Sequence, residues 1–101
     1  MIFRRSRFDD LVRRQLEAFA EDESELLEEA REAEHAYDSA GKEDAEEAYS
    51  EFQLVLEAGG ERLEAIRDAY AATLDEETGE AYAEAFARAA RRRYPKLAGE
   101  L

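Results

Sequence analysis

Cysteine and tryptophan are absent from the sequence, and proline occurs once, at Pro95. Without cysteine the chain forms no disulfide, no thiolate metal site and no cysteine nucleophile. No apolar run approaches the roughly 20 residues that a membrane-spanning helix requires. The basic start, residues 1–5, is not followed by the apolar stretch of a secretory signal. We therefore expect a cytoplasmic protein that has no membrane as a partner.

Positive charge is also scarce, since 14 lysines and arginines stand against 27 aspartates and glutamates, for a formal net charge of -13. A surface this acidic repels phosphate backbones, so we expect no nucleic acid as a partner. Acid is densest from Glu21 to Glu47, where only Arg31 and Lys42 oppose the carboxylates. This stretch predicts either a solvated face or a docking surface for a basic protein or divalent cations.

The rest of the composition is typical of a helical protein, with glutamate, alanine, leucine and arginine dominant. Apolar residues recur in alternating steps of four and three over residues 12–37 and again over residues 45–70, which is the spacing of one helix face. Glu23 interrupts the first series and Gly59 the second, but neither interruption shifts the phase. We therefore predict that each series is one continuous helix, with a kink at residues 22–24 as the alternative.

The expected helix ends follow from local signals. Ser6 and Asp9 have the spacing of a capping box. Gly41 is placed to take the left-handed conformation that ends many helices, and Pro95 cannot continue the last one. We predict a single all-α domain over residues 1–101. It is a three-helix antiparallel bundle built on a long helical hairpin, with helices at about 6–39, 43–74 and 76–94 and the hairpin tip extending beyond the third helix.

The interruptions coincide when the helices are packed against one another. A tight turn at Gly41 pairs residues equidistant from it, so that Glu23 faces Gly59. A second turn centred on Glu76 makes Arg93 face Gly59 as well. We predict a structural polar layer in which Arg93 pairs with Glu23, while the missing side chain of Gly59 leaves room for both.

The segment 52–56 is apolar nearly all round the helix, whereas a hairpin partner covers only one stripe. We predict that a second copy of the chain covers the remainder in a homodimer. The alternative cover is the carboxyl-terminal segment 96–101, through Leu97 and Leu101. The residues predicted to form the oligomer interface are Leu27, Phe52, Leu54 and Val55.

One spacing is compatible with metal binding. Glu32 and His35 form a Glu-x-x-His pair, which supplies two ligands from one helix in di-iron carboxylate bundles. The arrangement resembles the encapsulated ferritins, two-helix proteins whose oligomers assemble the metal site between subunits, although their motif lies on the second helix. His35 lies on the helix side opposite Ala33 and Tyr37, so we favour a solvated histidine and keep the ferritin-like bundle as the alternative.

The sequence contains no glycine-rich phosphate loop, no Gly-x-Ser-x-Gly motif and a single histidine. We therefore expect neither an enzyme nor a resident cofactor. The function predicted is that of a non-enzymatic interaction or structural protein: an acidic helical homodimer that docks a partner on its acidic hairpin.

Overall fold

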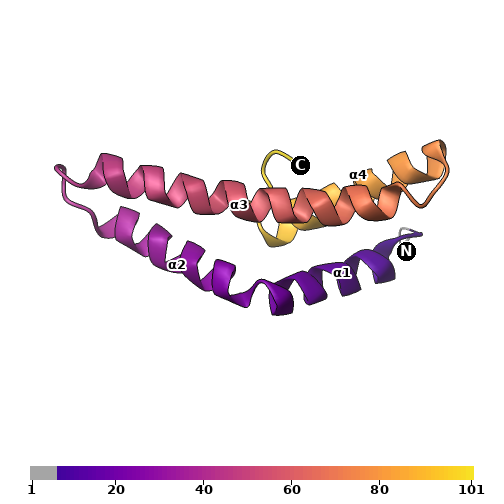
Figure 1. Cartoon of the computed structure of the whole chain (residues 1–101), viewed down its shortest axis with the longest axis horizontal. Helices are drawn as coiled ribbons and strands as arrows, with labels where there is room; N and C mark the ends of the chain where they lie inside the picture. The colour runs from indigo at the N-terminus through magenta and orange to yellow at the C-terminus, as the bar shows by residue number, and fades with distance from the viewer. Residues whose placement is uncertain (1–6) are drawn as a thin grey trace, which may run out of the picture.

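The computed structural model describes residues 7–101, which form four helices in chain order (Figure 1): α1 Asp9–Asp22, α2 Ser24–Ser39, α3 Ala45–Ala71 and α4 Glu76–Arg93. This part of the chain contains no strand, and none of its helices is long and apolar enough to cross a membrane. The predicted all-α helical bundle is confirmed, but with four helices, because the first predicted helix is divided. Ser6, the expected cap, lies outside the described residues.

The division falls at Glu23, whose backbone dihedrals are φ -110° and ψ 31°. The Glu23 N–H donates the closing hydrogen bond of α1, to the Phe19 carbonyl at 2.8 Å, and the Glu23 carbonyl accepts the opening one of α2, from the Leu27 N–H at 3.0 Å. The two helices therefore meet at this single residue, and the chain bends there. The prediction of one continuous helix over residues 6–39 was wrong, and the kink at residues 22–24 is what the structure shows.

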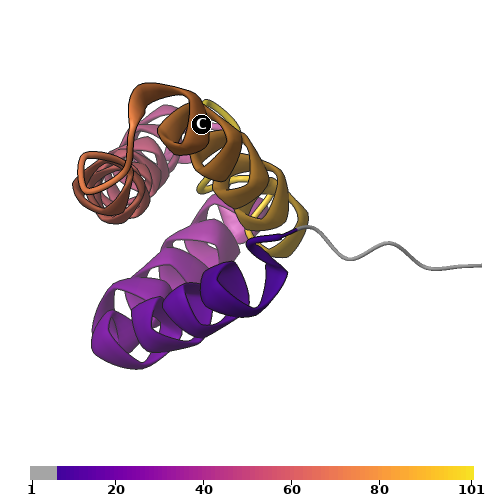
Figure 2. The same ribbon diagram turned by 90° about the vertical axis from the view of Figure 1, so that its right-hand side faces the viewer.

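The bend has a tertiary cause. α4 packs against both α3 and α1, whereas α2 packs against α3. Seen from the end, α1, α3 and α4 occupy three corners of a triangle (Figure 2). α1 must lean toward α4 to bury its apolar face, and α2 must lean toward α3 beyond the end of α4. One straight helix cannot do both, so the chain changes direction between them.

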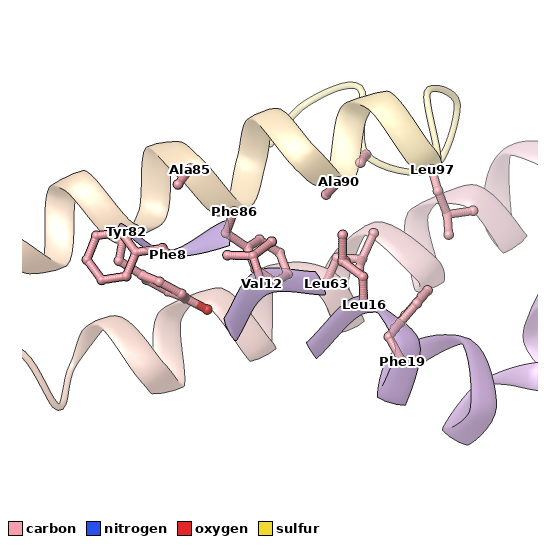
Figure 3. Packing of buried hydrophobic residues seen from close by; sticks show 11 residues of the cluster. Phe8, Val12, Leu16, Phe19, Leu63, Tyr82, Ala85, Phe86, Ala90 and Leu97 are labelled. Atoms are coloured by element: carbon pink, nitrogen blue, oxygen red, sulfur yellow. The ribbon is translucent and has the colours of Figure 1, made fainter. Parts of the chain in front are cut away.

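The core lies in the half of the molecule that contains α1, α4 and the second half of α3 (Figure 3). The Tyr82 ring is fully buried, with its centroid 4.8 Å from that of Tyr70 and 5.6 Å from that of Phe8. Tyr70 and Tyr82 are equidistant from Glu76, so this part of the predicted packing is confirmed. The Tyr82 hydroxyl donates a 2.7 Å hydrogen bond to Gln15 Oε1, so the buried phenol is not left without a partner.

The α3 helix continues through Gly59 and Gly60 without interruption, as predicted. A Cβ atom on Gly59 would lie 2.6 Å from Leu97 Cγ, and one on Gly60 would lie 2.9 Å from the Leu97 carbonyl oxygen. The two glycines therefore allow the segment that follows α4 to lie directly on α3. The helix loses about 1 kcal/mol per glycine relative to alanine, and at both positions the missing side chain leaves room for Leu97.

The prediction for Gly41 was wrong. No glycine in the described part of the chain has a positive φ, and α2 ends instead at Ala40, whose ψ of 139° is extended. A Cβ atom on Gly41 would have no heavy atom within 4 Å. The connection from α2 to α3 over residues 40–44 contains a turn in which the Asp44 N–H donates to the Gly41 carbonyl at 3.0 Å. It does not use the left-handed conformation that Gly41 would permit.

The start of α4 provides a pH-dependent prediction. Asp75 Oδ2 accepts a 3.1 Å hydrogen bond from the Thr78 N–H, and hydrogen bonds from Thr78 lower the pKa of Asp75. A carboxyl whose pKa is lower in the folded state stabilises it above the unfolded pKa, and this contribution is lost as pH falls through the folded pKa. We expect Asp75→Ser, which retains an N-cap oxygen, to lose less stability than the wild type between pH 5 and pH 3 in thermal melts. An equal loss in both proteins would contradict this assignment.

Candidate functional site

The acidic stretch forms a separate arm. Residues 24–57, which comprise α2, the connection and the first half of α3, extend past the end of α4 (Figure 1). This segment, called the acidic arm below, carries twelve carboxylates against Arg31 and Lys42, and α2 contains no buried residue. Most of the net negative charge of the protein is thus concentrated on the part that has the least core.

The exposed large apolar side chains also lie on the acidic arm. Within the described residues they are Tyr37, Tyr49 and Leu54, of which Leu54 is 66% exposed. The Tyr37 ring packs against Tyr49, with centroids 5.3 Å apart, and against Phe52 at 6.3 Å. The acidic arm therefore presents aromatic and aliphatic side chains to solvent beside its carboxylates.

The predicted oligomer interface is only partly exposed. Phe52 and Val55 are 7% and 8% exposed within the single chain, and Leu27 is partly buried against the core. The segment after α4 folds back onto α3 through Leu97, which was the alternative cover for this region. Of the four predicted interface residues, only Leu54 remains available to a second copy, and the homodimer stays a prediction.

A hollow lies beside Leu54 on the face of the arm between α2 and α3, with a volume of about 410 Å³. Its floor consists of small and aliphatic side chains, and three carboxylates stand at its rim. We call it the acidic hollow. Its residues are Glu29, Glu32, Ala33, Ala36, Glu51, Leu54 and Val55.

A larger groove, of about 670 Å³, lies where α2 begins and α4 ends. We call it the cationic groove, because Arg31, Arg93 and Lys96 line it together with one carboxylate, Glu34. The Lys96 ammonium donates a hydrogen bond to Glu34, and this bond with the charge of the carboxylate raises the pKa of Lys96. The remaining residues of the cationic groove are Ala20, Ser24, Leu27, Ala30, Phe52, Leu56, Tyr94, Pro95 and Leu97.

The predicted polar layer of Glu23, Gly59 and Arg93 does not form. The Glu23 carboxylate pairs with Arg62, Gly59 contacts Leu97, and the Arg93 guanidinium lies 5.4 Å from the centroid of the Tyr94 ring. The assumed turn was too short. Because the connection occupies residues 40–44, opposite positions on α2 and α3 are displaced by about one helical turn.

The metal-binding candidates remain far from a complete site in one chain. Glu32 and His35 are both exposed on α2, and Glu32 belongs to the rim of the acidic hollow. The described residues contain no group of three or more side chains that could hold a metal ion. A ferritin-like site would therefore require ligands from a second subunit.

The sequence reasoning missed the ion pairs of Arg62 and Lys96. Both make ion pairs with residues far along the chain, Arg62 with Glu23 and Lys96 with Glu34. Long-range pairs of this kind leave no local pattern. Gly59-Gly60 did leave a signal, because two glycines inside an unbroken helix indicate that another segment approaches closely.

Together these features define an all-α bundle with a projecting acidic arm, an acidic hollow on that arm and a cationic groove at its base. No protein-family model, no curated protein and no solved structure matches this chain.

Proposed function

We propose that the protein is a non-enzymatic interaction protein whose acidic arm binds a basic, amphipathic helix of a partner at the acidic hollow. The observation that carries the proposal is Leu54, 66% exposed, beside an apolar floor that Glu29, Glu32 and Glu51 surround. A partner helix with leucine or alanine on one side and lysine or arginine beside it matches this arrangement. The aliphatic stems of basic side chains cover apolar floor while their charged ends reach the carboxylates.

The size of each contribution decides what holds the partner. An exposed ion pair contributes about 0–1 kcal/mol, so three rim carboxylates alone give weak binding. Burial of Leu54 and the floor around it supplies the rest, at about 25 cal/mol per Å² of apolar area. The concentrated charge of the arm mainly accelerates encounter with a basic partner, and this effect weakens as salt is added.

The proposal is tested with a synthetic leucine/lysine helix of about fourteen residues, roughly 21 Å long, titrated against the full chain by calorimetry. We expect the combined substitution of Glu29, Glu32 and Glu51 by glutamine to weaken binding by about tenfold. The matched control replaces Glu61, Glu77 and Glu80, three exposed carboxylates outside the arm, and we expect a change of less than about twofold. Equal weakening in both variants, or no binding to the wild type, contradicts the proposal.

Self-association through Leu54 is the second candidate, and it corresponds to the predicted homodimer. Two arms of like charge repel each other, so salt strengthens such a dimer, whereas salt weakens binding of a basic helix. Light scattering after size exclusion distinguishes the two. A fraction of dimer that increases with salt, and that is lost in Leu54→Glu, supports the homodimer. A monomer mass at tens of micromolar protein excludes it.

Metal content distinguishes the ferritin-like alternative from the proposed interaction protein. Iron or manganese bound at a fixed ratio to the chain, and lost in the Glu32→Ala/His35→Ala variant, would support it. The cytoplasmic location and the absence of catalytic activity stay predictions.

A further inference from the structure

The cationic groove is a second candidate site, distinct from the acidic hollow and independent of the proposed function. It lies at the base of the arm, where α4 ends at Arg93 and the chain turns at Pro95 onto α3. Its apolar lining comes from α2, α3 and the segment after α4, chiefly Leu27, Phe52 and Leu56. A volume of about 670 Å³ is within the range of roughly 300–1,000 Å³ that small-molecule sites occupy.

The position of the groove is held by two contacts of the segment after α4. Leu97 packs against the bare backbone of Gly59, and Lys96 pairs with Glu34 on α2. The Lys96 ammonium also lies 5.9 Å from the centroid of the Phe52 ring. One wall of the groove thus contacts both helices of the arm.

The cationic groove has a net positive charge, whereas the protein as a whole has a net negative charge. In a chain of net charge -13, three of the four charged residues that line it are cationic. Arg31 pairs with Glu28 and Lys96 pairs with Glu34. Arg93 has no carboxylate partner among the described residues, and its guanidinium lies over the Tyr94 ring. The groove therefore combines an apolar floor with one cation that is available to an external anion.

We propose that the cationic groove binds a free long-chain carboxylate, with the hydrocarbon chain over Leu27, Phe52 and Leu56 and the carboxylate at Arg93. A guanidinium binds a carboxylate through two parallel hydrogen bonds. A single anionic head suits a single unpaired guanidinium, whereas a polyphosphate would need several cations and would meet the negative field of the whole chain.

The experiment titrates the full chain with dodecanoate, kept below its micelle concentration, and follows heat and melting temperature. We expect saturable binding that raises the melting temperature, and a loss of affinity of about tenfold in Arg93→Gln. The matched control is Arg91→Gln, an exposed arginine in the same turn of α4 that does not line the groove, and its affinity should equal that of the wild type.

Two further measurements make the result decisive. Dodecylammonium has the same chain with the opposite charge, and we expect it to bind much more weakly than dodecanoate. Ala30→Trp places a large side chain in the groove and should abolish dodecanoate binding, whereas Ala36→Trp on the other face of α2 should not. Equal binding of the two amphiphiles, equal affinity in Arg93→Gln and wild type, or no saturable binding of dodecanoate would overturn the proposal.

Discussion

Replacing Phe86 by alanine is expected to lower the free energy of unfolding by about 3–5 kcal/mol. Phe86 is 0% exposed and lies in the buried cluster shown in Figure 3, with its ring centroid 6.0 Å from that of Tyr82. Its removal leaves a cavity between α1, α3 and α4 that the surrounding helices cannot fully close. Since a domain of this size is stable by only about 5–15 kcal/mol, the loss is a large fraction of the total.

Urea unfolding followed by circular dichroism measures this loss. The matched control is Leu54→Ala, a large-to-small change at a side chain that is 66% exposed, and we expect it to change stability by less than about 0.5 kcal/mol. Similar losses in the two variants would mean that the core is not where the structure places it.

Gly59→Leu is expected to destabilise the protein by about 1–3 kcal/mol and to detach the segment after α4. The Cβ atom alone would lie 2.6 Å from Leu97 Cγ and 2.9 Å from Leu97 Cδ1, so the Leu97 side chain must move to make room for the larger one. The helix itself gains up to about 1 kcal/mol when glycine is replaced, so a net loss would show that the contact with Leu97 outweighs this gain.

Hydrogen exchange detects the detachment directly. The Ala98 N–H, bonded to the Tyr94 carbonyl at 2.8 Å, should exchange faster in Gly59→Leu than in the wild type. Gly41→Ala is the control, because its Cβ meets no heavy atom within 4 Å. The Leu97 carbonyl oxygen would lie 2.9 Å from a Cβ atom on Gly60, so Gly60→Leu should be damaging as well.

The helices were predictable because the signals that define each one, its apolar spacing and its end residues, lie within the same short segment. Apolar spacing placed α3 and α4 within a few residues of their observed bounds, and it correctly passed Gly59 without a break. The bend at Glu23 was predicted only as the alternative, because apolar spacing does not show where α4 ends relative to the first helix. An unbroken phase in the sequence is compatible with a bend, since one residue, Glu23, both ends α1 and begins α2.

The contacts between residues of α2 and α3 depend on the length of the connection between the two helices. A connection over residues 40–44, instead of a tight turn at Gly41, moves α3 along α2 by about one turn, so that Tyr37 meets Tyr49 and not Ala45. The same displacement brings Glu23 to Arg62. The acidic arm was visible in the composition, but the hollow and the groove arise from packing between segments far apart in the sequence.

The uneven burial along the molecule has a consequence for its dynamics. α2 contains no buried residue, whereas α4 contains Tyr82, Phe86 and Ala90 among the least accessible side chains of the protein. Native-state openings have free energies that follow such differences, so we expect the chain to divide into two cooperative units, or foldons. We expect the unit around α4 to open only with global unfolding, and α2 to open at lower cost and more often. A ligand that contacts α2 therefore changes the exchange protection of the arm without necessarily changing the global stability.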